Sequence, residues 1–142
     1  MEQCELQAKI NKAKNEIVEL RYNIQSMYDR KDAYGIEKSK AYNLIDQVEA
    51  YYSNKQNKIK ALEGVKGRAN TTMLAKLMDL FSYESMNVMI DGYECIADYI
   101  QNNIRMADEK IEEAEDRIRR LQINIYNWEN EIRNMKIIES EI

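Results

Sequence analysis

The fold is decided by residues 100–135, which read IQNNIRMADEKIEEAEDRIRRLQINIYNWENEIRNM. The apolar residues in this stretch recur at alternating steps of four and three residues. They are Ile100, Ile104, Ala107, Ile111, Ala114, Ile118, Leu121, Ile125, Trp128, Ile132 and Met135. A period of 3.5 residues is typical of a helix that packs lengthwise against another helix. The stretch therefore predicts a long helix with one apolar seam, and it indicates packing rather than chemistry.

The N-terminal half of the chain carries a second seam with the same period. It runs through Leu6, Ile10, Ala13, Ile17, Leu20, Ile24 and Met27, and after Lys31, Tyr34 and Lys38 it resumes at Ala41, Ile45, Val48 and Tyr52. The period is kept across Gly35, so we predict one continuous helix there. A short loop at Gly35 is the alternative, because glycine weakens a helix interior. Lys31 and Lys38 either extend their ammonium groups to solvent or help to specify register and partner.

The region between the two seams contains the best turn signal in the sequence. Gly64 and Gly67 predict a helix stop, and Asn70, Thr71 and Thr72 are candidate N-caps for the helix that follows. The apolar spacing over residues 73–81 predicts a short amphipathic helix. Residues 82–85 predict a loop or a shift in helix phase before the second seam begins at Met86.

The two seams match each other as an antiparallel pair. Ile10 then faces Trp128, Ala13 faces Ile125, and Ile24 faces Ala114. In the last two layers a small residue meets a large one, as interdigitated packing prefers. We therefore expect an all-α fold: an elongated antiparallel helical hairpin, coiled-coil-like, with a short extra helix at the closed end. The chain is expected to form one domain, with arm one over about 3–62, the turn and short helix over about 63–85, and arm two over about 86–138.

The residue types argue against an enzyme. The 142 residues include no histidine, which removes the commonest general base and metal ligand, and the two cysteines, Cys4 and Cys95, form no metal-binding motif and are expected to be free thiols. Carboxylates such as Asp108, Glu112 and Glu115 follow the spacing of a solvated helix face. No glycine-rich phosphate loop is present. We predict no catalytic residue, no cofactor and no metal.

The charge distribution is uneven but does not indicate a nucleic-acid partner. The formal net charge is −4, and counting along the sequence gives +3 for residues 1–70 and −7 for residues 71–142. Neither half is basic enough for a phosphate-binding surface. No cleavable signal peptide and no apolar run long enough to span a membrane is visible. We expect a cytoplasmic protein, or one exported without a cleavable signal peptide.

Some apolar residues lie off the seams. Four of them, Leu44, Tyr51, Met89 and Ile96, gather on one edge of the expected hairpin near its closed end. One interpretation is a local widening of the hairpin core. The other is a surface for a further helix, from a second copy or from another protein, because apolar patches that a chain does not cover itself mark interfaces. These four residues are the candidate partner-binding residues.

The second half of the chain resembles the helical-hairpin proteins of bacterial type VII secretion, and most closely the YwqH-like accessory proteins that accompany LXG-domain toxins. The resemblance is carried by Tyr93-Glu-Cys-Ile96-Ala-Asp98-Tyr99-Ile100 and then by Ile104, Asp108, Lys110-Ile111, Glu115, Ile118 and Leu121. The pairs Tyr28/Asp32 and Tyr42/Asp46 are similar to the Tyr-x-x-x-Asp secretion signal of such proteins, although they lie in the first arm. The Trp-x-Gly turn of the related WXG hairpins is absent.

This resemblance implies a non-enzymatic adaptor, a targeting partner or chaperone, that binds the helical N-terminal domain of an LXG toxin. The expected partner is therefore a helical protein, which could be the toxin domain or another small hairpin. The alternative is a structural, homo-oligomeric coiled-coil protein of a phage or cytoskeletal assembly. Heptads specify helix neighbours but not chain identity, so self-association stays open at this point.

Overall fold

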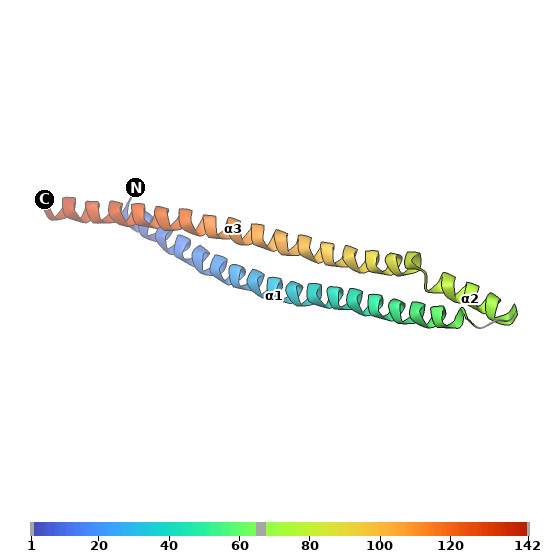
Figure 1. Cartoon of the computed structure of the whole chain (residues 1–142). Coiled ribbons are helices and arrows are strands. Elements are labelled where there is room, and N and C mark those ends of the chain that lie inside the picture. The colour runs from blue at the N-terminus through green and yellow to red at the C-terminus, as the bar shows by residue number, and fades with distance from the viewer. Residues whose placement is uncertain (1, 65–67, 142) are drawn as a thin grey trace. The chain divides into compact units, whose positions relative to one another are not determined.

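The computed structural model describes residues 2–64 and 68–141, and for residues 68–70 it describes only the backbone. These described residues form three helices: α1 (Gln3–Leu62), α2 (Arg68–Leu80) and α3 (Tyr83–Glu141). Long α1 packs against the bent pair α2 and α3, and the described residues contain no strand. The expected all-α helical hairpin with a short helix at its closed end is confirmed (Figure 1).

The helix boundaries follow the seams closely. α1 runs through Gly35 without a break, so the prediction of one helix there is confirmed and the loop alternative is wrong. α3 begins three residues before Met86 and continues to Glu141. The N-cap prediction for residues 70–72 is wrong, because α2 already begins at Arg68 and includes them. The expected turn residue Gly67 lies outside the described residues.

The chain divides into two compact units, each built from one segment of α1 and one of α3. Unit 1 consists of Met1–Asp32 and Arg105–Ile142, and unit 2 consists of Ala33–Ile104. In Figure 1 unit 1 contains the blue start of α1 and the red end of α3, and unit 2 contains the whole of α2. Each unit is described by itself below.

The core of unit 1 is the predicted seam. Leu6 and Ile10 are its most deeply buried large side chains, and they cluster with Ile132. Ala13 and Ile17 form a second cluster with two residues of α3, Ile118 and Leu121. These contacts agree with the pairing of the two seams that the sequence favoured. Burial of the seam supplies the main stabilising term here, at roughly 25 cal/mol per Å² of apolar surface removed from water.

The core of unit 2 continues the same period. Ala41, Ile45, Tyr52 and Ile59 of α1 are buried, and so are Ile90, Ala97 and Ile100 of α3. Lys38 lies on this seam as well, and its Nζ donates a hydrogen bond of 2.6 Å to Oε1 of Gln101. The seam lysine is therefore half-buried and satisfied by a polar side chain at the flank of α3.

The break between α2 and α3 is built by hydrogen bonds. Ser82 is the N-cap of α3, because its Oγ accepts a hydrogen bond of 3.1 Å from the backbone N–H of Ser85. Phe81 closes α2 with a bond from its N–H to the carbonyl of Leu77. The carbonyl of Phe81 in turn accepts a hydrogen bond of 2.9 Å from Nε2 of Gln56 on α1. The interruption predicted at residues 82–85 is thus the start of α3, in which Ser82 is the N-cap and residues 83–85 form the first turn.

The seam of unit 1 makes a testable contribution to stability. We expect Leu6→Ala to lower the free energy of unfolding by about 2–5 kcal/mol, because it leaves a cavity at a fully buried site. Leu80→Ala deletes the same atoms from a side chain that is 63% exposed, and it should change stability by about 0.5 kcal/mol or less. Urea unfolding followed by circular dichroism measures both. Equal losses for the two variants would contradict the assignment of Leu6 to the core.

Candidate partner-binding surface

The four residues predicted as a partner-binding edge all lie in unit 2 and all remain on its surface. Leu44 is 39% exposed, Tyr51 54%, Met89 42% and Ile96 50%. In the heptad frame they occupy positions that flank the seam, Leu44 and Tyr51 on α1 and Met89 and Ile96 on α3. We call these four residues the apolar edge. Their exposure leaves most of this apolar surface available to another helix.

Two residues of the apolar edge are held in place by neighbours. The ring of Tyr51 lies 6.0 Å from that of Tyr52 and 5.9 Å from that of Phe81, measured between centroids. The Tyr52 hydroxyl lies 3.3 Å from the sulfur of Met89 and donates to it. Because Tyr52 is buried in the seam, both contacts tie the edge to the core. A surface that is already ordered costs less conformational entropy when a partner binds.

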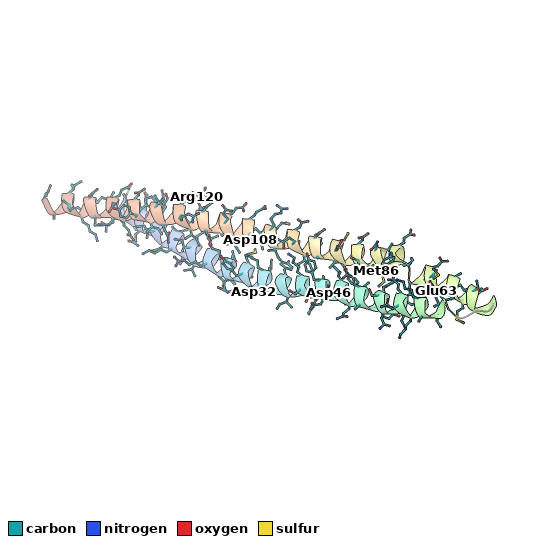
Figure 2. All side chains as sticks on the ribbon, in the orientation of Figure 1. Asp32, Asp46, Glu63, Met86, Asp108 and Arg120 are labelled. Carbon is teal, nitrogen blue, oxygen red and sulfur yellow. The ribbon has the colours of Figure 1, made fainter. Side chains whose placement is uncertain are left out.

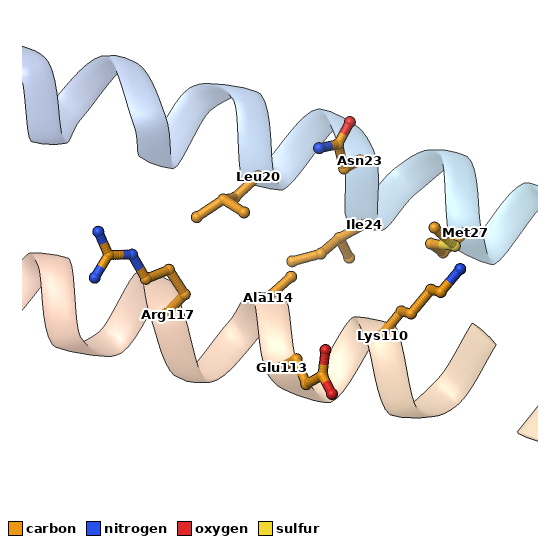
Figure 3. A pocket seen from close by; sticks show the side chains of 8 residues that line it. All are labelled: Leu20, Asn23, Ile24, Met27, Lys110, Glu113, Ala114 and Arg117. Atoms are coloured by element: carbon orange, nitrogen blue, oxygen red, sulfur yellow. The ribbon is translucent and has the colours of Figure 1, made fainter. Parts of the chain in front are cut away.

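Shallow pockets also lie outside the apolar edge, and each unit contains at least one. In unit 1 a groove of about 320 Å³ separates Leu20, Ile24 and Met27 of α1 from Lys110, Ala114 and Arg117 of α3, with Ile24 and Ala114 pointing toward one another (Figure 3). In unit 2 a pocket of about 310 Å³ at the closed end is lined by Ile59, Met78, Phe81 and Tyr83 among others. Both are open to solvent and neither gathers a set of catalytic groups.

Some ion pairs of unit 1 cross between α1 and α3, namely Lys14–Glu129, Lys31–Asp108 and Glu16–Arg117. Glu16 accepts hydrogen bonds of 2.9 and 3.3 Å from Arg117, and this bonding holds the pKa of the Glu16 carboxyl below its ordinary value. Lys31 reaches from the seam to Asp108, and the hydrogen bond to that carboxylate raises the pKa of the Lys31 ammonium. Both shifts come from charge pairs at the surface, not from burial in a cleft.

The secretion-signal-like residues all lie within continuous helix. Tyr28 and Asp32 belong to the α1 segment of unit 1, and Tyr42 and Asp46 to that of unit 2; Figure 2 labels both aspartates. The two tyrosine rings lie beneath seam lysines, Tyr28 at 5.4 Å from Nζ of Lys31 and Tyr42 at 5.9 Å from Nζ of Lys38. These contacts give both tyrosines a local packing role.

Cys4 and Cys95 are free thiols, as expected, and both are exposed. Over residues 2–64 and 68–141, no group of three or more His, Cys, Asp or Glu side chains could hold a metal ion. Within the same residues, no helix combines the length and apolarity needed to cross a bilayer.

Comparison of the chain with protein-family models, curated proteins and solved structures finds no match.

Sequence reasoning missed the residues that support the apolar edge. Tyr52 was placed on the seam, but its hydroxyl contact with Met89 was not predicted. Phe81 was assigned to the short apolar helix, whereas its ring packs between Tyr51 and Tyr52. The aromatic character of these three residues was the available signal. Their proximity depends on how the chain closes after Leu62, which no periodicity specifies.

The ion pair between Glu16 and Arg117 gives a prediction about pH. Because the folded pKa of Glu16 is depressed below its ordinary value of 4.5, its contribution to stability is present above that pH and is lost as pH falls through the folded pKa. We expect Glu16→Gln to lower the melting temperature slightly at pH 7, by the amount typical of an exposed ion pair, and to have no effect at pH 2.

A double-mutant cycle with Arg117→Gln isolates the interaction between the two side chains. The coupling should be measurable at pH 7 and vanish at pH 2 in thermal melts. A coupling of equal size at both pH values would show that the carboxylate charge is not its source.

Proposed function

We propose that this chain is a non-enzymatic helical adaptor, a targeting partner or chaperone for a type VII-secreted LXG toxin, and that it binds the helical N-terminal domain of that toxin. The observation that carries the proposal is the apolar edge. Four exposed apolar side chains, two of which are held by neighbouring side chains, occupy heptad positions that flank the seam on two paired helices. Such a flank can accept an amphipathic helix, whose apolar side chains at helical spacing would cover it.

The mode of binding follows from the geometry of unit 2. Leu44 and Tyr51 lie seven residues apart on α1, and so do Met89 and Ile96 on α3, so each pair occupies one line along its helix. A helix that lies along the flank between α1 and α3 would touch both lines and complete a three-helix bundle. Tyr51 is the best candidate for an energetic anchor, because tyrosine is enriched among the residues that dominate binding energy.

The surroundings of the edge favour binding over chemistry. Tyr51 and Met89 are held by Phe81 and Tyr52, and Lys55 places its ammonium 5.4 Å from the centre of the Tyr51 ring. These contacts order the apolar surface around Tyr51 and Met89. The type VII assignment itself comes from the resemblance of residues 93–121, and it identifies the partner to test first.

The proposal is tested by affinity purification of the full chain from the cell that makes it, followed by mass spectrometry. The expected result is the capture of an LXG-domain protein. We expect Leu44→Glu and Ile96→Glu to reduce that capture by about tenfold or more, since each places a charge within the buried interface.

Val18→Glu and Ile123→Glu are matched controls, because both introduce the same charge at exposed apolar sites outside the edge, 66% and 59% exposed. They should leave capture unchanged. If no LXG-domain protein is recovered, or if the edge variants retain it as well as the controls do, the adaptor proposal is wrong.

A further inference from the structure

The closed end of the hairpin carries an excess of positive charge. Residues 53–80 contain six lysine and arginine residues and two acidic ones, which gives a net charge of +4. The formal net charge of the whole chain is −4, so the other residues together carry −8. This one segment is therefore attracted to anionic surfaces although the chain as a whole is acidic.

The two helices of the closed end repeat one spacing of lysine and apolar residues. In each, a first residue is followed by two others at three and seven positions, and side chains at these intervals share one helix face. We call these residues the lysine flank: Lys55, Lys58 and Leu62 on α1, and Met73, Lys76 and Leu80 on α2.

The α1 and α2 parts of the lysine flank lie on the same side of the helix pair. Ile59 of α1 is buried and Leu77 of α2 is half-buried. The residues that directly follow these two, Lys60 and Met78, both line the pocket at the closed end. The lysines that directly precede Ile59 and Leu77 therefore lie on the opposite side from that pocket, and both belong to the lysine flank.

The charges of the lysine flank are not neutralised by its neighbours. Over residues 2–64 and 68–141, none of the three lysines takes part in an ion pair. Lys58 and Lys76 are exposed, and Lys55 is half-buried with its Nζ 5.4 Å from the centre of the Tyr51 ring. The flank thus presents three positive charges to whatever approaches it.

The rest of the lysine flank is apolar, and the carboxylates of residues 53–80 lie off it. Leu62, Met73 and Leu80 are 43%, 58% and 63% exposed. Of the two acidic residues of this segment, Glu63 lines the pocket on the other side. Asp79 comes two positions after half-buried Leu77 and therefore faces away from α1. A ligand of this flank must match positive charge and exposed apolar side chains together.

We propose that the lysine flank binds the surface of an anionic lipid bilayer. The aliphatic part of a lysine side chain lies along apolar surface while its ammonium group reaches the phosphates of the headgroups. Leu62, Met73 and Leu80 enter the boundary between headgroups and acyl chains. The charged lysines between them keep the contact at this boundary and out of the bilayer core.

The chemistry of the flank favours a bilayer over a protein or a nucleic acid. Protein interfaces are enriched in arginine and depleted in lysine, whereas this flank has three lysines and no arginine. A nucleic acid would neutralise the lysines but would leave the exposed leucine and methionine side chains in water.

The distribution of charge around the closed end favours a bilayer as well. Lys60 lies on the other side of the helix pair, where a single partner helix on the lysine flank would not reach it. The field of an anionic bilayer extends about 8 Å at physiological ionic strength, so it attracts the cations of both sides. An extended anionic plane therefore uses more of the positive charge than one helix can.

Flotation with lipid vesicles tests the contribution of charge. The full chain should float with vesicles of phosphatidylserine and phosphatidylcholine, and it should not float with vesicles of phosphatidylcholine alone. Lys58→Gln combined with Lys76→Gln should weaken binding about thirtyfold, because each cation close to an anionic surface contributes about fivefold. Lys12→Gln combined with Lys136→Gln is the matched control: it removes the same charge from exposed sites of unit 1 and should leave binding unchanged.

A second pair of variants tests the contribution of apolar contact. Met73→Gln combined with Leu80→Gln keeps every charge and should weaken binding about tenfold, because less apolar surface enters the bilayer. Val18→Gln combined with Ile123→Gln makes the same kind of change at exposed sites of unit 1 and should have no effect. A duplex DNA oligonucleotide, followed by fluorescence anisotropy, should not bind at physiological salt.

These measurements decide the proposal. Binding that requires phosphatidylserine and is weakened in both flank variants, but in neither control, supports it. The absence of flotation with anionic vesicles, or equal flotation of the Lys58 and Lys76 variant and its control, overturns it. So does a loss that only the lysine substitutions cause, or tighter binding to duplex DNA than to vesicles.

This inference does not depend on the adaptor function, because the lysine flank and the apolar edge share no residue. A chain that captures an LXG-domain protein but does not float with anionic vesicles would remove only this inference. A chain that floats with them but captures no LXG-domain protein would remove only the adaptor function.

Discussion

Contact between two apolar seams is the interaction on which the rest of this structure depends. In both units every seam position of α1 from Leu6 to Tyr52 is buried or half-buried, and so is every seam position of α3 from Met86 to Met135. Helices of about 60 residues need this contact, because intrinsic helix propensity contributes only tenths of a kcal/mol per residue. The seam therefore also decides which surfaces remain outside it and are free to bind.

The architecture could be predicted from the sequence because it follows from one repeated rule. Wherever the chain is helical, the alternating steps of four and three residues identify the positions on the seam. The pairing of small with large residues then predicted the register of the two helices, and the buried clusters around Ile10 and Ile17 agree with that register. Lys31 and Lys38 did not interrupt it, because long side chains can occupy a seam position while the charged group reaches Asp108 or Gln101 at its edge.

The closed end could not be predicted in the same way, because its contacts join residues that no period relates. Gln56 meets the Phe81 carbonyl across 25 positions, and Tyr51 meets the Phe81 ring across a similar separation. The start of α2 was misplaced for a related reason. Asparagine and threonine are favoured as N-caps but are also tolerated inside a helix, so residues 70–72 alone do not locate the boundary. The four residues of the apolar edge could be predicted because they are apolar and lie off the seam. The contacts that Tyr52 and Phe81 make with them could not, because those contacts depend on how the hairpin closes.

The regularity of the seam has a consequence for the length of the molecule. Each heptad in α1 meets one heptad in α3, so seven residues can be removed from one helix and seven from the opposite position of the other without changing any remaining contact of the pair. Removal of seven residues from one helix alone would shift every seam residue beyond that point by one heptad, so that it would face a different residue of the other helix. The capped junction at Ser82 and the Gln56 contact would be unaffected by a matched removal in unit 1. The length of the paired helices can thus change only in matched steps of seven residues, while the apolar edge stays at a constant distance from the closed end.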